Sequence, residues 1–455
     1  MPRDALAASA AAHASRRATF AAVLALAGPA IGQSLLETLV FLVDRAMLGR
    51  HSAASLASMQ ISGPLTWSVL SVMGAFAVGV VALVGRATGA GDRALAGAAV
   101  RAGLVLAVVV GSLAGVLVTA GMPLILAAFP GATPEVHAAA RDYLTMLAPG
   151  MPLLLVVGVA AAALQASGDT RTPFLIATVG NLVNAPLAWV LIFGRFGVPS
   201  MGTRGAALGS VIAMLVQVAL LLAALMRRDG RVSLRGRGGE RAAALRFLRV
   251  SGPSFAEKIV QHLGFFVFVT MIGALGSTAM AANQALVSLE SICFLSADGF
   301  GIAAASIVAQ RLGARRPEDA AYAARIATGL AVLALGSVGL SFAVAPHLLL
   351  RLFTSDASIL AVAAPVMLVA AVSQPFMATG VVLSQAVRGS GDTRSALGVT
   401  LLGGLVVRLA ATYYFTRVAG LGLVGVWLGS TCDWIVRTAL LTVVWARGGW
   451  KGASV

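Results

Sequence analysis

The chain has 455 residues and a formal net charge of +16. Hydrophobic residues make up 59% of it and charged residues only 11%, whereas about 25% of the residues in a typical soluble domain are charged. A soluble protein of this length could not cover its surface with so few charges. The composition therefore excludes a soluble fold and predicts an all-α membrane protein that crosses the bilayer many times.

The basic residues exclude one source of energy for transport. Of the 33 basic residues, only Lys258 and Lys451 are lysines, and neither precedes Ser or Thr. A nucleotide-binding P-loop needs Gly-Lys-Ser/Thr, so an ion gradient, or an ATPase on another chain, would have to drive transport. The positive charge fits loops that orient membrane helices better than it fits nucleic-acid binding.

A membrane-spanning helix needs about 20 apolar residues, and the chain has twelve such stretches between polar or turn-rich breaks. They cover residues 21–48, 57–84, 95–119, 136–163, 173–193, 204–226, 247–272, 281–308, 321–345, 359–386, 396–416 and 422–446. With both termini inside, the inner segments hold 23 basic residues and the outer segments 7. Because basic residues accumulate on the cytoplasmic side, we expect both termini to be cytoplasmic.

The longest polar break is rich in arginine and divides the chain into two lobes. The expected parts are an N-terminal tail (1–20), an N-lobe (21–226), a basic cytoplasmic linker (227–246), a C-lobe (247–446) and a C-terminal tail (447–455).

The two lobes repeat each other in sequence. A shift of 224 residues brings Gly28-Pro29 onto Gly252-Pro253, and a shift of 223 brings Ser167–Arg171 onto the identical Ser390–Arg394. Near the ends of the lobes, a shift of 220 matches Gly202, Gly205 and Gly209 with Gly422, Gly425 and Gly429. The chain is thus predicted to be two six-helix bundles in the same orientation. Parallel repeats suit alternating access between two lobes better than they suit a channel.

Polar side chains within the first span indicate where an ion could bind. Gln33, Glu37 and Asp44 share one helix face, although an ionisable group at membrane depth costs about 2.5–3.5 kcal/mol on insertion scales. A buried carboxyl group can take a proton on one side and release it on the other, or hold Na⁺ or a cationic substrate. We expect Asn181 and Asn184 of the fifth span to face Asp44; the alternative is a purely structural contact between helices.

Further polar residues in the spans are candidates for a substrate cavity. Glu257 stands beside Lys258, with which it could pair, and Asp433 is expected to pair with Arg437 four residues later. Because no metal-ligand spacing and no nucleophile–base pair is present, we expect neither an enzyme nor a cofactor. The expected cavity residues are Gln33, Met59, Gln60, Glu257, Gln284, Glu290 and Asp298.

Several motifs together resemble a known family. They are Gly28-Pro29, Val43–Gly49, Gly168–Pro173, Asn181–Asn184, Gly205–Gly209 and Arg388–Thr393. In combination they are similar to the multidrug and toxic compound extrusion (MATE) transporters. Asp298–Phe300 and Gln310–Ala314 resemble the DinF-like branch.

The resemblance implies two bundles around a central cavity that export drugs or other organic, often cationic, compounds in exchange for H⁺ or Na⁺. It assigns the coupling carboxyl group to Asp44 and a supporting amide to Asn184. It also implies a multi-pass protein of a bacterial inner membrane that binds no nucleic acid and works as a monomer.

The chain departs from the family at Ala188, a position that is polar in many members. It also lacks a carboxylate in 359–386, and the acid that some members have in the seventh span would fall near Gln261 rather than Glu257. These last two departures argue against a Na⁺ site in the C-lobe and favour H⁺ coupling through the N-lobe.

Two other functions are compatible with the sequence. A flippase for a lipid-linked precursor could use a related two-lobe scaffold, but its cavity should be strongly cationic, and only Arg408 and Arg437 lie in the middle of spans. A receptor or scaffold that transports nothing would not require the internal repeat or the carboxylates within the spans.

Overall fold

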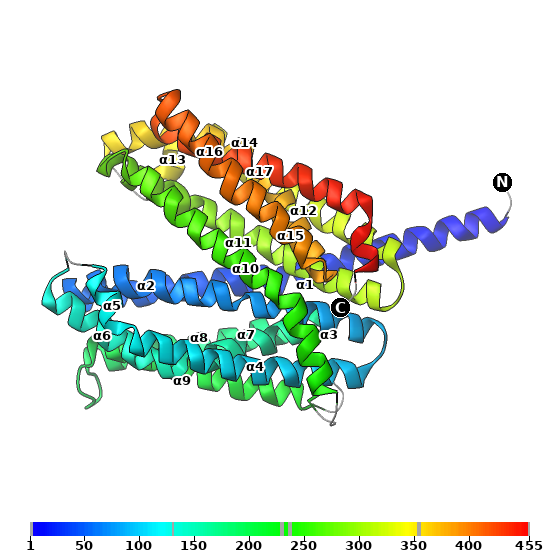
Figure 1. The fold of residues 1–455 in the computed structure, drawn as a ribbon, viewed down its shortest axis with the longest axis horizontal. Coiled ribbons are helices and arrows are strands. Elements are labelled where there is room, and N and C mark those ends of the chain that lie inside the picture. Colours follow the sequence, from blue (N-terminus) through cyan, green and yellow to red (C-terminus); the bar gives the residue numbers. More distant parts are fainter. Residues whose placement is uncertain (1–2, 130–131, 228–231, 235–238, 353–355, 454–455) are drawn as a thin grey trace. The chain divides into compact units, whose positions relative to one another are not determined.

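The computed structural model describes residues 3–129, 132–227, 232–234, 239–352 and 356–453. Side chains are described from Arg17 onward, apart from a few positions inside the helices. The described chain is helical throughout, without a strand, as Figure 1 shows. This confirms the all-α class that the composition predicts.

The first half of the chain consists of ten helical elements, one of them a single 3-10 turn. They are α1 (Arg3–His51), α2 (Ala53–Met73), α3 (Ala75–Gly89), α4 (Arg93–Ala120), α5 (Met122–Ala127), α6 (Pro134–Leu147), η1 (Ala148–Gly150), α7 (Met151–Ala166), α8 (Arg171–Phe193) and α9 (Gly202–Leu225).

The second half follows the same order but contains two π-helical segments, η2 and η3. Its elements are α10 (Glu240–Gly273), α11 (Ser277–Gly313), α12 (Pro317–Val344), α13 (Pro346–Leu350), α14 (Ala357–Gly389), α15 (Thr393–Thr400), η2 (Leu401–Val407), α16 (Arg408–Tyr413), η3 (Tyr414–Val418), α17 (Gly422–Arg447) and η4 (Gly449–Gly452).

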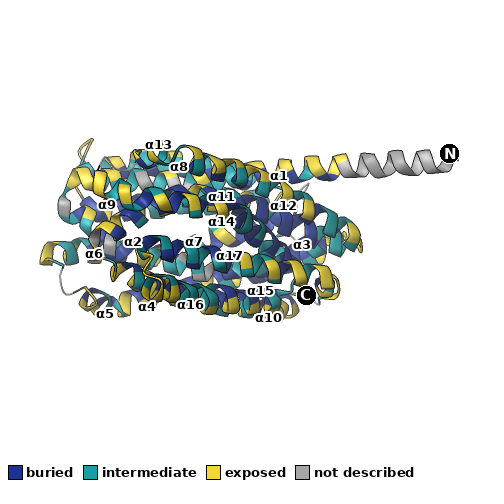
Figure 2. Cartoon of the chain, turned by 90° about the horizontal axis from the view of Figure 1, so that it is seen from above, coloured by how far each residue is buried: buried dark blue, intermediate teal, exposed yellow. Residues whose placement is uncertain are grey.

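These elements correspond to the twelve predicted spans. Within the described chain, ten helical segments are long and apolar enough to cross a membrane. The consecutive helices α2 and α3, and helix α17, cover the two remaining predictions. Many exposed side chains are large and apolar, among them Leu117 on α4 and Leu340 on α12, and Figure 2 shows exposed bands along the helices. Such surfaces fit a lipid environment.

The sequence repeat is also visible in the backbone. Gly168 and Gly391, which follow α7 and α14, have φ angles of 91° and 94°. Gly202 and Gly422, at the starts of α9 and α17, both have a φ of 52°. Glycine occupies such positive φ values without the steric cost that a side chain brings. Both halves therefore turn the chain between their last three spans in the same way.

The chain forms two compact units that do not coincide with the two halves of the sequence. One unit contains Met1–Ile31 and Ala256–Val455, and the other contains Gly32–Phe255. Helices α1 and α10 are thus each divided between the units, two residues after Pro29 and Pro253 respectively. Val23 and Ala27 of α1 belong to the apolar core that α11, α12, α14 and α17 build. The lobe boundaries expected from the sequence remain predictions.

Candidate functional site

Two of the four coupling residues expected from the sequence, Asp44 and Asn184, are in contact inside the unit of residues 32–255. Asp44 lies on α1 and Asn184 on α8, and the Asn184 Nδ2 donates a hydrogen bond to the Asp44 Oδ2 over 3.4 Å. Asn184 is buried and Asp44 is half-buried. The structure therefore brings together a carboxyl group and an amide that are 140 residues apart in the sequence.

Polar atoms of Asp44, Asn184 and Asn181 lack hydrogen-bond partners among the described residues. The Asp44 Oδ1, the Asn184 Oδ1 and the Asn181 Nδ2 are buried and have no hydrogen-bond partner among the described residues. Within the same part of the chain, no basic side chain forms an ion pair with Asp44. Since a buried polar atom without a partner is costly, the free oxygens suit a ligand that brings positive charge, such as a proton or a small cation.

Tight apolar packing closes the site toward one end of the helices. Leu48 and Ala188, one turn beyond Asp44 and Asn184, are fully buried in a cluster with Met59. A Cβ atom built on Gly209 of α9 would lie 3.2 Å from the Cα atom of Ala188. A larger polar side chain at position 188 would have to displace α9, which is a physical reason for alanine there.

The other expected residues of this half have different surroundings. The Gln33 Oε1 accepts a hydrogen bond from the Gln165 Nε2 over 3.2 Å, a partner that the sequence did not reveal. Met59 is buried in the core, where the Ser62 hydroxyl approaches its sulfur. The side chains of Glu37 and Gln60 lie outside the described residues, so their roles remain predictions.

In the second half, Glu257 is part of a buried ion pair. Its carboxylate, 2% exposed, accepts hydrogen bonds from the Arg388 Nε over 3.1 Å and from the Arg388 Nη2. The Thr400 hydroxyl donates a third over 2.6 Å. Lys258, the neighbour that the sequence suggested as a partner, donates instead to the Gln261 Oε1. Sequence reasoning missed Arg388 because it ended the span at residue 386, whereas α14 continues to Gly389.

Three expected cavity residues, Gln284, Glu290 and Asp298, lie on α11, and no hydrogen bond or ion pair joins them among the described side chains. Asp298 accepts a hydrogen bond from the Gln385 Nε2 of α14 over 2.7 Å. Gln284 is exposed, and Glu290 is half-buried without an ion pair among the described side chains. These residues therefore stay candidates for the cavity on the evidence of the sequence alone.

Two arginines share one fully buried carboxylate on α17. The Asp433 Oδ1 lies 2.5 Å from the Arg437 Nε, which confirms the predicted pair, and the Asp433 Oδ2 lies 2.9 Å from the Arg408 Nε. The Arg408 guanidinium lies over the ring of Phe268, 5.4 Å from its centroid, and 5.9 Å from that of Trp434. This cluster identifies the partner of Arg408, which could not be read from the sequence.

The repeat relates this cluster to the coupling pair. A shift of 224 takes Asp44 to Phe268, and the shift of 223 that holds at Ser167–Arg171 takes Asn184 to Val407, the residue before Arg408. The Arg408 guanidinium lies over the Phe268 ring. Where the first half has a carboxyl group and an amide, the second half thus has two apolar residues at the equivalent positions, with a guanidinium beside them.

Comparison with known proteins settles the family. The model of one family, MatE, matches residues 29–190 and again residues 253–414. The chain belongs to the MatE family. The two matches are 224 residues apart, so each half of this MatE chain carries one copy of the family's repeat. Within the described part of the chain, no group of three or more His, Cys, Asp or Glu residues could hold a metal ion.

Other members of the MatE family align over nearly the whole chain. A probable multidrug resistance protein NorM from Thermotoga maritima is 29% identical over 95% of this chain and 93% of its own. Multidrug resistance protein PmpM from Pseudomonas aeruginosa is 29% identical over 96% and 89%. A crystal structure of MATE in the bent conformation superimposes with a TM-score of 0.85 over 94% of each chain, at 22% identity. That structure supports the twelve-helix fold.

Proposed function

We propose that the chain is a secondary active efflux transporter. It exports drugs or other organic, often cationic, compounds across the bacterial inner membrane in exchange for H⁺, by alternating access of its two lobes. Membership of the MatE family and two relatives named as multidrug resistance proteins support export. The DinF-like branch, the monomeric state and the preference for H⁺ over Na⁺ are parts of this proposal.

The observation that supports H⁺ coupling is that no described basic side chain pairs with the carboxyl group of Asp44. Among the described side chains, this carboxyl group has one neutral partner, Asn184, and one buried oxygen without a partner. It can therefore gain or lose a proton without breaking an ion pair. The carboxylates of Glu257 and Asp433, by contrast, are each held by arginine, and protonation would leave buried guanidinium groups uncompensated.

Asn184 suits both states of such a carboxyl group. Its amide nitrogen donates to ionised Asp44, and its amide oxygen has no partner among the described residues. A protonated Asp44 can donate to an amide oxygen, because an amide offers both a donor and an acceptor. The pair can thus exchange a proton with little rearrangement, which is what a site used in every transport cycle requires.

The flippase alternative has less support. It needs cationic side chains that are available to bind a phosphorylated lipid. Arg408 and Arg437, the two arginines expected in the middle of spans, are both engaged by Asp433. We therefore keep this function as one outcome of the test below.

Transport by purified protein in liposomes tests the proposal. The probe is a fluorescent organic cation, driven by an imposed pH gradient in one arm and by a Na⁺ gradient in the other. We expect movement with the pH gradient only. Movement with only the Na⁺ gradient would contradict H⁺ coupling, and no movement by folded protein in either arm would favour anionic or lipid substrates.

Replacement of Asp44 by Asn tests the residue itself. We expect Asp44→Asn to abolish pH-driven transport without reducing the yield of folded protein, because the amide cannot be protonated in the same pH range. Asp142→Asn is the matched control, since Asp142 pairs with Arg204 in a partly exposed contact of the same unit. Retained coupled transport in Asp44→Asn would disprove the assignment.

A further inference from the structure

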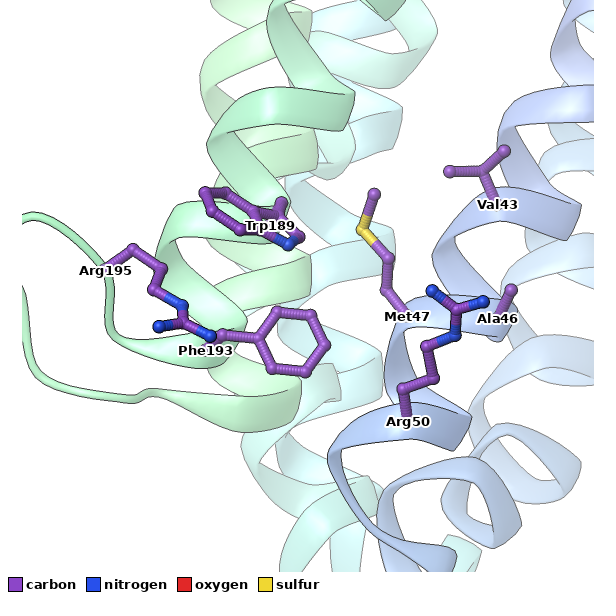
Figure 3. A pocket seen from close by; sticks show the side chains of 7 residues that line it. All are labelled: Val43, Ala46, Met47, Arg50, Trp189, Phe193 and Arg195. Atoms are coloured by element: carbon purple, nitrogen blue, oxygen red, sulfur yellow. The ribbon is translucent and has the colours of Figure 1, made fainter.

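A cavity of about 410 Å³ lies between α1 and the end of α8. Val43, Met47 and Arg50 line it from α1, and Trp189, Phe193 and Arg195 line it from the other side. Figure 3 shows the two arginines entering from opposite sides, with Met47 and Phe193 between them. The cavity therefore combines an apolar floor with two cationic side chains.

This cavity is separate from the Asp44–Asn184 pair. In a helix of 3.6 residues per turn, Val43, Met47 and Arg50 share one face of α1, and Asp44 lies about a quarter turn around the helix from the centre of that face. On α8, Trp189 and Phe193 likewise share a face that does not include Asn184. Asp44 and Asn184 do not line the cavity, so the two sites use different faces of the same two helices, and the proposed coupling step does not account for the cavity.

The charge of the cavity is not balanced by the protein. Neither Arg50 nor Arg195 forms an ion pair among the described residues. The Arg195 guanidinium lies 5.7 Å from the centroid of the Trp189 ring, which holds it at the rim. Guanidinium groups bind phosphate oxygens through paired hydrogen bonds, so an anion of this kind matches the cavity.

An apolar surface continues from the cavity along α8. Leu182, Val179 and Leu175 follow on the exposed side of the helix and are 69%, 42% and 60% exposed. Tryptophan and arginine near the end of a membrane helix mark the level of the lipid headgroups. A ligand that fills both parts must have an anionic head and long apolar chains.

We propose that this cavity binds the phosphate of an anionic phospholipid, with its acyl chains along the exposed stripe of α8. The basic-residue count predicts that these ends of α1 and α8 face outward, which places the lipid in the outer leaflet. The lipid would brace the two helices that carry Asp44 and Asn184. Its binding is independent of whether the proposed transport function is correct.

Native mass spectrometry of the purified protein tests this proposal. The probes are dioleoylphosphatidylglycerol and its zwitterionic counterpart dioleoylphosphatidylcholine. We expect wild type to retain one phosphatidylglycerol preferentially, and the double variant Arg50→Gln/Arg195→Gln to bind it at least about tenfold more weakly, since each basic residue near an anionic lipid contributes about 1 kcal/mol. Both arginines are exposed, so we expect the variant to fold.

A matched variant separates a specific site from general attraction. Arg351→Gln/Arg417→Gln removes two exposed charges from the other half, also on the predicted outer side, and we expect it to bind phosphatidylglycerol as wild type does. Equal loss in both double variants, or equal binding of the two lipids, would overturn the proposal. Displacement of the lipid by millimolar inorganic phosphate would also overturn it, because a free anion would then be the ligand.

A second readout locates the lipid. Phosphatidylglycerol with brominated acyl chains should quench part of the protein's tryptophan fluorescence. We expect Trp189→Phe to lose that part, whereas quenching unchanged by Trp189→Phe would show that the lipid binds elsewhere.

Discussion

At the scale of single residues, the acids within the spans differ in whether an arginine pairs with them. Asp44 has a neutral partner and a free oxygen, whereas Glu257 and Asp433 are compensated by arginines. An ion pair hinders a group that must change its charge, because protonation of a paired acid leaves the buried guanidinium uncompensated. We propose that the same side-chain chemistry serves coupling at Asp44 and stabilises the fold at Glu257 and Asp433.

The ion pair of Glu257 leads to a stability prediction. Glu257→Gln leaves the Arg388 guanidinium, 14% exposed, without its counter-charge. Loss of one partner from a buried pair costs about 3–5 kcal/mol, so we expect a clearly lower unfolding temperature in detergent. The double variant Glu257→Gln/Arg388→Gln should recover part of the loss. A Glu257→Gln protein as stable as wild type would show that the pair is not formed in solution.

Part of this site could be predicted from the sequence. Asp44 and Asn184 stand out because polar groups are rare within spans. The partners of Glu257 and Asp298 could not be predicted in this way. Arg388 is 131 residues from Glu257, and Gln385 is 87 residues from Asp298. Hydropathy carries no information about which distant side chains pair. The expected roles of Gln33, Gln284 and Glu290 rest on the same polarity argument, and that of Met59 rests on the adaptable surface that methionine offers to a ligand; all four remain predictions.

At the scale of elements, equivalent glycines set the turns of both halves. Gly168 and Gly391 adopt nearly the same positive φ, and Asp169 and Asp392 follow them. The Asp169 Oδ1 accepts from the Thr172 backbone N–H over 2.9 Å, and the Asp392 Oδ1 from that of Ser395 over 3.2 Å. The repeated motif is thus a turn that reverses the chain and begins the next helix.

Replacement of one of these glycines should be costly. In Gly168→Ala, the new side chain is forced into the left-handed region, at about 1–2 kcal/mol, so we expect a lower unfolding temperature. The control is Gly158→Ala in α7, where a Cβ atom meets nothing within 4 Å. There, alanine should stabilise the helix by up to about 1 kcal/mol. Equal effects of the two changes would contradict the role of φ.

Hydropathy predicted the elements well but not their internal form. The span expected at 396–416 is interrupted by the π-helical segments η2 and η3. Apolar composition does not distinguish a π-helix from an α-helix, so this irregularity could not be predicted from hydropathy. This irregularity places Arg408 at the junction of η2 and α16, beside Phe268.

At the scale of the whole molecule, the orientation in the membrane is a prediction that rests on the distribution of basic residues alone. Labelling of single cysteines in intact cells would check it, after Cys293 and Cys432 are replaced by Ala. We expect a membrane-impermeant maleimide to modify Pro199→Cys from outside and Arg227→Cys only after the cells are opened. Both positions are exposed. The reverse pattern would mean that both termini face outward.

The division of α1 and α10 has a consequence for the covalent connection between the halves. Val23 and Ala27 pack in the core built by the second half, and Phe247 of α10 stacks on Phe76 of α3, with ring centroids 5.9 Å apart. Each half thus supplies a helical segment that completes the other's unit, as in an exchange of arms. A chain cut between residues 229 and 230 should therefore reassemble, and the two co-expressed fragments should purify together. A first fragment that starts at residue 32 should fail to purify with the second fragment, because it lacks the segment of residues 1–31 that packs in the other unit. That result would show that this segment holds the halves together more than the covalent linker does.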